Sequence, residues 1–381
     1  MDKQLSPALL SKGKSEVASR RERIILDLVR RTPDITRADV TDRSDLPQPT
    51  CHRLLDRLAD RGLISITKGA PQGRGQPSPH LKLSPDAAFS VGISVNTDVV
   101  TFLIVDLSCE VIDQQSFETL PMSKSSTLQR LQSILDEMLL KHGLDRHRLV
   151  GVGFAISGFF LKKGVSVNAP EPLLDWSLDP LLEQLEQTFD APVWLENGGT
   201  TGAIGESLVG AGQSYRTFGY LAFNYGFGGG LVLDGQPIFG ANGNAGELST
   251  MLRQEEMDNR PGLGSLVASL NQSGHDIGSM IDLAAKIDVD WPEVQAWVSR
   301  IRPQLERIIH GLTGILDPEA IVFGGEIPRE LANLLITKHR FWHMSRYGQA
   351  RPAPELVVSN LVHDSSALGA ALLPLKNCYF L

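Results

Sequence analysis

The sequence predicts an α/β protein in which two similar lobes follow a small N-terminal domain of three helices and two strands. Three observations lead to this prediction. Helical periodicity fills most of the first 83 residues, alternating strand and helix patterns begin at Phe89, and the order of those patterns occurs twice. With 381 residues the chain is also too long for one ordinary core, which indicates more than one domain.

Charge divides the chain at the same place. Residues 1–83 contain 16 Lys and Arg against 10 Asp and Glu, a net charge of +6, whereas residues 84–381 contain 20 against 34, a net charge of −14. A basic segment on an acidic body indicates a polyanionic partner at one end only.

The composition favours a soluble cytoplasmic protein with no membrane partner. No apolar run approaches the ~20 residues that a membrane span requires. The polar segment Met1–Lys14 lacks the apolar core of a signal peptide. Cys51, Cys109 and Cys378 are far apart and form neither a metal-ligand spacing nor a disulfide framework, and we expect Cys51 to be a core residue.

The first 83 residues follow the order of a winged helix-turn-helix domain. Apolar residues at helical spacing predict helices over Arg20–Arg31, Thr36–Arg43 and Thr50–Asp60. Leu63–Ile66 and His80–Leu83 are strand patterns on either side of a loop rich in Gly, Pro and Arg. We place this domain at residues 1–83 and expect its N-terminal tail to be disordered.

This arrangement predicts DNA binding, because the third helix of such a domain enters the major groove. Outward residues of that helix would contact base edges or phosphates, and basic residues of the wing would follow the backbone or the minor groove. The candidate DNA-binding residues are Gln48, Thr50, His52, Arg53 and Arg57 at the helix and Lys68 and Arg74 in the wing. The alternative is a small helical subdomain whose arginines only keep it soluble.

The remaining residues, 84–381, predict the two lobes. The strand patterns are Val91–Val95, Val100–Asp106, Glu110–Gln114, Leu149–Ile156, Val193–Leu195, Thr217–Phe223, Gly230–Leu233 and Ala320–Phe323, and the helical patterns are Leu128–Lys141, Leu181–Phe189, Thr200–Val209 and Trp291–Leu316. Three strands followed by alternating helix and strand, given twice, fit a duplicated domain with a cleft between its lobes. Glycine-rich turns are predicted at Asn224–Gly230 and Gly324–Gly325.

Eight short motifs occur along this body in a fixed order. They are Gly92-Ile93, Asp106-Leu107, Gly151-Val152-Gly153, Trp176, Glu196-Asn197, Gly226–Gly230, Gly240–Glu247 and Leu316-Asp317-Pro318 through Gly325. One glycine cluster is weak evidence, but eight motifs in order behind a winged helix are specific. Over essentially the whole chain they resemble the ROK family of repressors, open reading frames and kinases, which implies the actin-like ATPase fold and a sugar site.

Two motifs depart from what the resemblance implies for a kinase. Phosphoryl transfer needs a carboxylate that accepts the hydroxyl proton, together with Mg²⁺ and backbone amides that hold the phosphates. In the family's kinases the base is the Asp of Glu-Asn-Asp, and here that position is Gly198. The family's first phosphate loop, Asp-x-Gly-Gly-Thr, corresponds to Ser94–Asp98, so Ser94 replaces the metal-associated carboxylate and Asn96 and Thr97 replace both glycines. We therefore expect no catalysis and no cofactor.

The resemblance also implies a zinc site in many members, built from a His after the Gly-Glu motif and a Cys-x-Cys-Gly-x-x-Gly-Cys run. Here Thr250 stands in place of the His, and residues 251–271 contain no Cys. Structural zinc needs Cys or His ligands. We therefore expect no metal, and we expect Leu263, Leu266 and Val267 to hold this loop by packing.

The side chains that remain for a sugar are carboxylates and amides, each of which can bond two neighbouring hydroxyl groups. The candidate ligand residues are Asn168, Glu171, Glu196, Asn197 and Glu247. Trp176 and Tyr225 have two interpretations, since each either packs on a sugar face or belongs to the core.

The sequence therefore predicts a sugar-responsive transcriptional regulator, more specifically a repressor of carbohydrate uptake or catabolism genes. It would bind operator DNA as a homodimer or higher homo-oligomer, and closure of the lobes around a sugar would move the paired winged helices. One alternative is an active sugar kinase in which Asp175 or Asp179 is a displaced base. The other is a DNA-binding protein whose pocket is vestigial.

Overall fold

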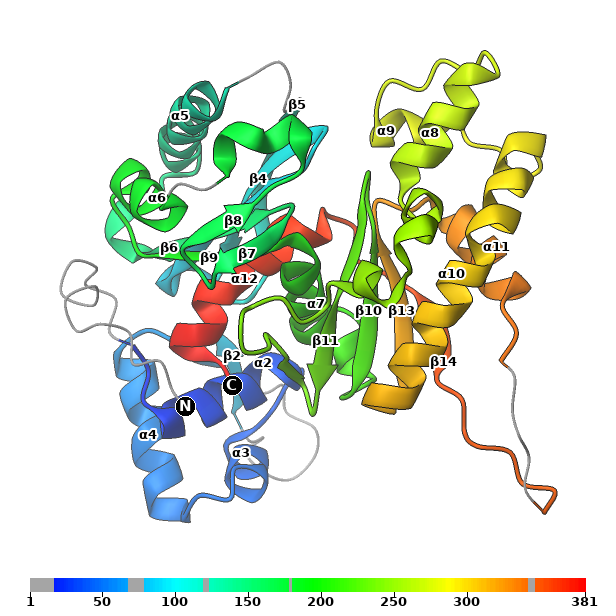
Figure 1. Cartoon of the computed structure of the whole chain (residues 1–381). Helices are drawn as coiled ribbons and strands as arrows, with labels where there is room; N and C mark the ends of the chain where they lie inside the picture. Colours follow the sequence, from blue (N-terminus) through cyan, green and yellow to red (C-terminus); the bar gives the residue numbers. More distant parts are fainter. Residues whose placement is uncertain (1–16, 68–78, 119–122, 178–179, 342–346) are drawn as a thin grey trace.

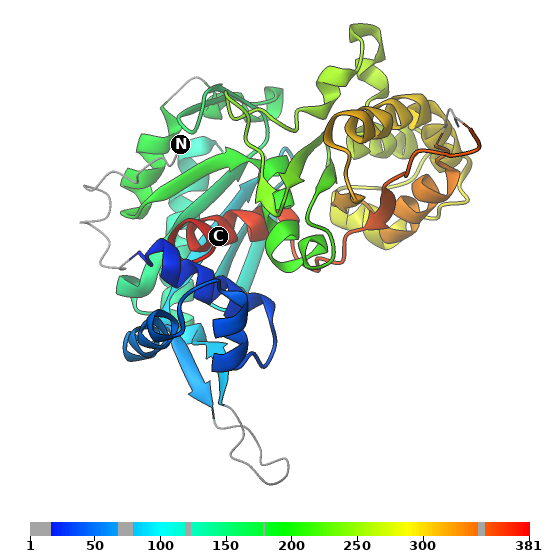
Figure 2. The same ribbon diagram turned by 90° about the horizontal axis from the view of Figure 1, so that it is seen from below.

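The computed structural model describes residues 17–67, 79–118, 123–177, 180–341 and 347–381. Figures 1 and 2 show a small N-terminal domain beside two lobes. The predicted tail up to residue 16, Lys68, Arg74 and Asp179 lie outside the described residues. Within the described segments, no helix combines the length and the apolar character that crossing a membrane requires.

The N-terminal domain has the predicted order of helices and strands. Its elements are α2 (Arg20–Arg31), α3 (Arg37–Arg43), α4 (Gln48–Asp60), β1 (Ile64–Thr67) and β2 (His80–Leu83). Ser19 begins α2 with a capping box, in which its N–H donates to the Glu22 carboxylate at 2.7 Å and its hydroxyl accepts from the Glu22 N–H at 3.4 Å. α4 begins before the predicted Thr50, because Pro49 is tolerated in the first turn of a helix.

The first lobe contains a five-stranded sheet in the order β5-β4-β3-β6-β9. Its strands are β3 (Phe89–Val95), β4 (Val99–Asp106), β5 (Val111–Glu118), β6 (Leu149–Ile156) and β9 (Val193–Asn197). β3, β4 and β5 form an antiparallel meander, whereas β6 runs parallel to both β3 and β9. The lobe also contains α5 (Lys124–His142), α6 (Leu181–Phe189) and a hairpin of β7 (Phe159–Lys162) and β8 (Ser166–Asn168).

The second lobe repeats this topology with a sheet in the order β12-β11-β10-β13-β14. Its strands are β10 (Phe218–Phe223), β11 (Phe227–Leu233), β12 (Gln236–Pro237), β13 (Ala320–Gly325) and β14 (Glu355–Val358), and its helices are α8 (Leu263–Gln272), α9 (Met280–Lys286), α10 (Pro292–Leu316) and α11 (Arg329–Lys338). Again three strands are antiparallel and the last two run parallel to β10. The predicted duplication is confirmed. Short 3₁₀ helices lie at Pro85–Ala87, Arg146–Arg148, Glu171–Trp176, Ala211–Gln213, Leu248–Met251 and Gln254–Asn259.

Two helices join the lobes, α7 (Gly198–Val209) and α12 (Ser365–Tyr379), and they cross the middle of Figure 1. α12 packs on β3 and β6 of the first sheet, α7 packs on β10 and β11 of the second, and the two helices pack against each other. Gly369 permits this contact, because a Cβ atom there would lie 1.6 Å from the carbonyl oxygen of Thr201. The helix pair is therefore held by close backbone contact.

The cores connect the N-terminal domain with the body. Leu26 of α2 and Leu55 of α4 belong to the same cluster of buried residues as Leu375 and Tyr379 of α12. Cys51 is buried in this cluster, as predicted. In the second lobe Leu263 and Leu266 are buried and Val267 packs against them, which confirms the predicted packing of that loop.

Two local predictions were wrong. Gly228–Gly230 lie in strand β11 and not in a turn, and Gly324 and Gly325 are the last two residues of strand β13 and not a turn after it. The turn that precedes β11 is shorter, and in it the N–H of Asn224 donates to the carbonyl oxygen of Gly226 at 3.0 Å. Glycine is required in β11 because the backbone of α7 approaches this strand closely: a Cβ on Gly230 would lie 2.7 Å from the carbonyl oxygen of Gly199.

Candidate functional site

Asn197 joins the two lobes. It ends β9 and caps α7, where its Oδ1 accepts a hydrogen bond from the N–H of Gly199 at 2.7 Å. Its Nδ2 donates to the carbonyl oxygen of Gly158 at 2.5 Å and to Oε1 of Glu247 at 3.1 Å. Both hydrogens of the amide are thus used, one within the first lobe and one to the second.

Glu247 lies at the end of the loop that follows β12. Burial raises the pKa of its carboxyl group, since a charge is costly away from water. The loop turns back at this point, because the hydroxyl of Thr250 donates to the carbonyl oxygen of Glu247 at 2.7 Å. Thr250, which stands where a zinc-bearing relative would have a His, therefore has a structural role in the loop.

A second pair of hydrogen bonds connects the lobes beside the first. The N–H of Phe160 in β7 donates to Oδ1 of Asn244 at 2.7 Å, and Nδ2 of Asn244 donates to the carbonyl oxygen of Phe160 at 3.0 Å. The amide of Asn244 thus pairs with the backbone of β7 as a neighbouring strand would. Asn244 was not among the predicted site residues. Its place inside the Gly240–Glu247 motif, together with its amide side chain, was the signal that could have identified it.

The structure brings the candidate sugar residues together to different degrees. Asn197 and Glu247 are bonded directly, and Glu196 precedes Asn197 in β9 and is half-buried. Asn168 is exposed in β8, next to Gly158, at which a Cβ would lie 2.4 Å from the Asn168 carbonyl oxygen. Glu171 is exposed at the start of a 3₁₀ helix.

The two aromatic candidates, Trp176 and Tyr225, differ in their exposure to solvent. Trp176 is 1% exposed and its ring centroid lies 5.7 Å from that of Phe154, so Trp176 is a core residue. Tyr225 is 45% exposed and lies against Gly264, where a Cβ would meet its ring at 2.8 Å. Of the two, only Tyr225 offers a ring face to a ligand.

The segment that corresponds to the first phosphate loop forms an ordinary hairpin turn. The N–H of Asn96 donates to the carbonyl oxygen of Val99 at 2.9 Å, and the hydroxyl of Ser157 donates to Oδ1 of Asn96 at 3.2 Å. Ser94 is buried in β3. Side chains therefore occupy positions at which a phosphate-binding loop needs bare backbone.

Carboxylates gather beside this turn. Asp98, Glu326 and Asp364 come from the β3–β4 turn, the end of β13 and the residue that caps α12. Burial raises the pKa of all three, and for Asp98 and Glu326 the nearby carboxylates raise it further. Among the described residues no group of three His, Cys, Asp or Glu has the arrangement of a metal site. This region is unfavourable for an anion such as a triphosphate.

The predicted DNA-contacting residues of α4 lie at the surface. Gln48, Arg53 and Arg57 are exposed, whereas Thr50 and His52 are half-buried. Nε of Arg57 also lies 3.4 Å from Oε1 of Glu22 in α2. Arg53 is thus a better candidate for a base or phosphate contact than Arg57.

Arginines of α2 hold the C-terminal ends of α7 and α12. Arg23 donates from Nε to the carbonyl oxygen of Phe380 at 2.6 Å and from Nη2 to that of Lys376 at 2.9 Å. Arg30 donates to the carbonyl oxygen of Leu208, and its guanidinium lies 5.3 Å from the ring centroid of Phe380. Cations are favourable at these ends because the last carbonyls of a helix carry partial negative charge.

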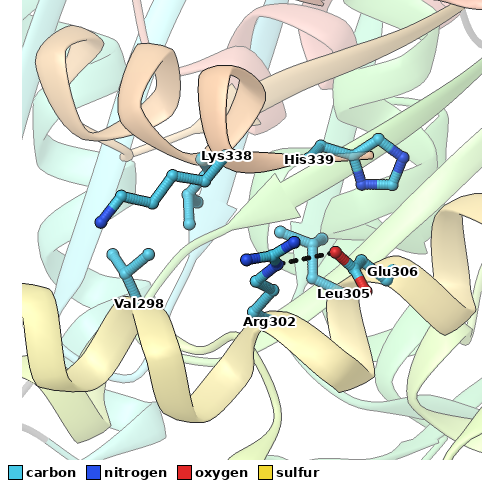
Figure 3. A pocket seen from close by; sticks show the side chains of 7 residues that line it. Val298, Arg302, Leu305, Glu306, Lys338 and His339 are labelled. Carbon is cyan, nitrogen blue, oxygen red and sulfur yellow. Dashed lines mark hydrogen bonds and ion pairs between the residues drawn. The ribbon is translucent and has the colours of Figure 1, made fainter. Parts of the chain in front are cut away.

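A further pocket lies between α10 and α11 of the second lobe (Figure 3). Its lining consists of Val298, Arg302, Leu305, Glu306, Leu335, Lys338 and His339. It contains no candidate sugar residue.

Comparisons with known proteins agree with this geometry. Residues 90–259 match the model of the ROK family, and residues 19–65 match that of a winged helix-turn-helix DNA-binding domain. An uncharacterized protein of Sinorhizobium fredii, y4fQ, is 27% identical over 361 residues, which cover 94% of this chain and 91% of that protein. A xylose repressor of Caldicellulosiruptor bescii is 26% identical over 216 residues, which cover 56% of this chain and 54% of the repressor.

Solved structures show the same fold. A ROK family transcriptional regulator, described as a homolog of the E. coli MLC protein, superposes with a TM-score of 0.69 at 19% identity and covers 94% of this chain and 96% of its own. A ROK family glucokinase from Streptomyces griseus, solved with glucose and AMPPNP, gives a TM-score of 0.58 at 19% identity and covers 75% of this chain and 99% of its own. The likeness to the regulator thus extends over more of this chain.

Proposed function

We propose that this chain, whose residues 90–259 match the ROK family and whose residues 19–65 match a winged helix-turn-helix DNA-binding domain, is a transcriptional regulator of the ROK family. Its affinity for operator DNA would change when a sugar binds between its lobes. Residues 1–83 would form the DNA-binding domain and residues 84–381 the sensor domain.

The path of α7 and α12 is the observation that carries this proposal. Both helices begin at the candidate sugar site, since Asn197 caps α7 and the Ser366 hydroxyl of α12 donates to the carbonyl oxygen of Gly198 at 3.0 Å. Both end at the DNA-binding domain, where Arg30 and Arg23 hold their last carbonyls. A ligand that displaces the helix starts therefore also moves the ends on which α2 rests.

Asn197 and Glu247 are the central sugar ligands in this proposal, with Glu196, Asn168 and Glu171 around them. The bond between Asn197 and Glu247 joins the lobes, so a sugar that bonds to both side chains would bind one arrangement of the lobes better than another. Such a difference in affinity is what a ligand needs to shift a conformational equilibrium.

The sensor domain has no kinase activity in this proposal. The position of the base is Gly198, which cannot accept a proton, and the phosphate loop is replaced by Ser94, Asn96 and Thr97. The carboxylates of Asp98, Glu326 and Asp364 oppose a triphosphate beside that loop. Asp175, a candidate for a displaced base, instead accepts a hydrogen bond from the N–H of Lys124 at 2.5 Å. No nucleotide or metal cofactor is expected.

The regulator would be a repressor of genes for carbohydrate uptake or catabolism, a role supported by the similarity to a xylose repressor. A homodimer is expected, because helix-turn-helix proteins read two half-sites about one helical turn apart. DNA binding also agrees with the cytoplasmic location that the composition favours.

Fluorescence anisotropy on DNA from upstream of the chain's own gene tests the proposal, with and without a panel that includes D-xylose and D-glucose. The expected result is tight, salt-sensitive binding that one sugar changes at least fivefold. DNA binding that no sugar changes, with no sugar-induced shift in melting temperature, would support a vestigial pocket. Sugar-dependent consumption of ATP would show that the chain is a kinase.

A further inference from the structure

Lys376 lies where α12, the second lobe and the DNA-binding domain meet. Its side chain is buried, with 7% of the residue exposed. Its Nζ donates to Oε1 of Gln236 in β12 at 3.0 Å and to a main-chain oxygen of Leu381 at 2.5 Å. Its own carbonyl oxygen accepts the hydrogen bond from Arg23 of α2. One residue thus contacts all three parts of the molecule.

Gln236, which accepts the hydrogen bond from Lys376, is joined to the candidate sugar site by a short segment of chain. Gln236 begins a stretch of twelve residues that ends at Glu247, and we call residues 236–247 the strap. Phe239 of the strap packs against the core that contains α2 and α12. Asn244 binds β7 of the first lobe, and Glu247 binds Asn197. The strap therefore contacts the sugar site at one end and Lys376 at the other.

The turn before the strap also approaches the DNA-binding domain. A Cβ at Gly235 would lie 4.0 Å from Nη2 of Arg31 in α2. Figure 1 shows the tip of the hairpin of β11 beside α2. The DNA-binding domain therefore rests on the second lobe as well as on α12.

We propose that Lys376 is a positioning residue that transmits sugar binding at Glu247 to the DNA-binding domain through its hydrogen bond to Gln236 of the strap. This inference rests on the proposed function and adds its route. A displacement of Glu247 would move the strap and with it Gln236. The hydrogen bond from Lys376 to Gln236 would then move Lys376, whose own carbonyl oxygen accepts the hydrogen bond from Arg23.

The magnitude of this contact suits such a role. A buried ammonium group is costly unless hydrogen bonds satisfy it, so Lys376 favours the arrangement in which Gln236 is present. A hydrogen bond to a charged group is strong enough to account for a coupling of about tenfold between two ligands. A methionine at this position would fill the same space but could not donate a hydrogen bond to Gln236.

The test compares Gln236→Ala and Lys376→Met with the wild-type chain and with Gln295→Ala. Gln295 is a matched control, because its Oε1 accepts from Nζ of Lys338 at 2.5 Å in the second lobe, away from the DNA-binding domain. Gln236 is exposed, so its variant keeps the fold even if Lys376→Met does not. The measurements are the dissociation constant for operator DNA with and without D-xylose, the dissociation constant for D-xylose, and amide hydrogen exchange in residues 20–31.

The expected result is that Gln236→Ala and Lys376→Met bind DNA and sugar within about threefold of wild type but lose the effect of one on the other. Exchange in residues 20–31 should also rise in these variants and not in Gln295→Ala. If Gln236→Ala keeps the full wild-type effect of sugar on DNA affinity, the proposed route is wrong while the proposed function stands. If D-xylose does not change the DNA affinity of the wild-type chain, the proposed function fails for D-xylose. Unchanged hydrogen exchange in Gln236→Ala would in that case also contradict the proposed role of the Lys376–Gln236 hydrogen bond.

Discussion

Nδ2 of Asn197 lies 3.1 Å from Oε1 of Glu247, and this contact joins the residue that caps α7 to the loop of the opposite lobe. The same Asn197 amide caps a helix, holds Gly158 and reaches Glu247. Its position is therefore fixed before any ligand arrives, and a sugar would meet a prearranged amide. Glu247 is the partner that a ligand would compete for.

Glu247→Ala should weaken sugar binding at least tenfold and leave DNA affinity in the absence of sugar within about twofold of wild type. In the proposed site Glu247 would supply hydrogen bonds to sugar hydroxyls, and its described hydrogen bond goes to Asn197 and not to the DNA-binding domain. Isothermal titration with the active sugar and anisotropy on DNA measure the two affinities. Glu255→Ala, at an exposed residue of the 3₁₀ helix Gln254–Asn259, is the control. Unchanged sugar affinity in Glu247→Ala would remove Glu247 from the site.

Gly198→Asp should fold and should not phosphorylate any sugar. A Cβ at Gly198 would lie 3.4 Å from Oγ of Ser366, which is an ordinary contact, so the position accepts a side chain without a backbone clash at Cβ. The base would then be present, but Ser94 and Asn96 still occupy the phosphate loop, and Asp98 and Glu326 still oppose a triphosphate. A coupled assay for ADP release with a sugar panel measures the activity. Sugar phosphorylation above the wild-type level would show that the phosphate region still binds nucleotide.

Arg53→Ala should weaken binding to operator DNA by about 5- to 150-fold, the effect of losing about 1–3 kcal/mol at one base contact. Arg53 is exposed on α4, whereas Arg57 also pairs with Glu22 and should matter less. Sugar-induced thermal stabilisation should not change. Arg300→Ala removes a charge from the exposed surface of α10 and serves as the control. Loss of both DNA binding and sugar stabilisation in Arg53→Ala would instead indicate a role in folding.

The sequence predicted the elements whose residues repeat at a clear period. Arg20–Arg31, Leu149–Ile156 and Leu181–Phe189 have the predicted bounds, because amphipathic or wholly apolar runs there end at polar residues. α12 was missed, although it connects the site to the DNA-binding domain. It is buried on nearly all sides between the two lobes, so its sequence shows no polar face by which periodicity could identify a helix.

The site was predicted in its residue types but not in its contacts. Asn197 and Glu247 came from motifs, and the structure shows that they bond to each other. Lys376 and Gln236 had no local signal, because their roles depend on partners far away in the sequence. The distance of 140 residues between Gln236 and Lys376 is an example. Only the packing of the lobes brings such pairs together.

His339 borders the pocket in Figure 3. Neither ring nitrogen has a hydrogen-bond partner among the described residues, and the residue is 7% exposed. Burial, followed by the charge of nearby His310, lowers the pKa of His339 from 6.5 to about 4. As the pH falls from 6.5 towards 4, the unfolded chain binds a proton at this residue and the folded chain does not. The stability that His339 contributes is therefore present above pH 6.5 and is lost as the pH falls, by up to about 3 kcal/mol.

His339→Leu should remove this dependence, because leucine fills the space and does not titrate. Urea unfolding followed by tryptophan fluorescence at pH 7 and pH 4.5 gives the free energy of unfolding for both proteins. The decrease between the two pH values should be smaller in His339→Leu than in wild type by about 2–3 kcal/mol. His147→Gln, at an exposed residue of the first lobe, should keep the wild-type decrease. An equal decrease in wild type and His339→Leu would mean that His339 is protonated in the folded protein at pH 4.5, and that the pocket beside it admits enough water to solvate the charge.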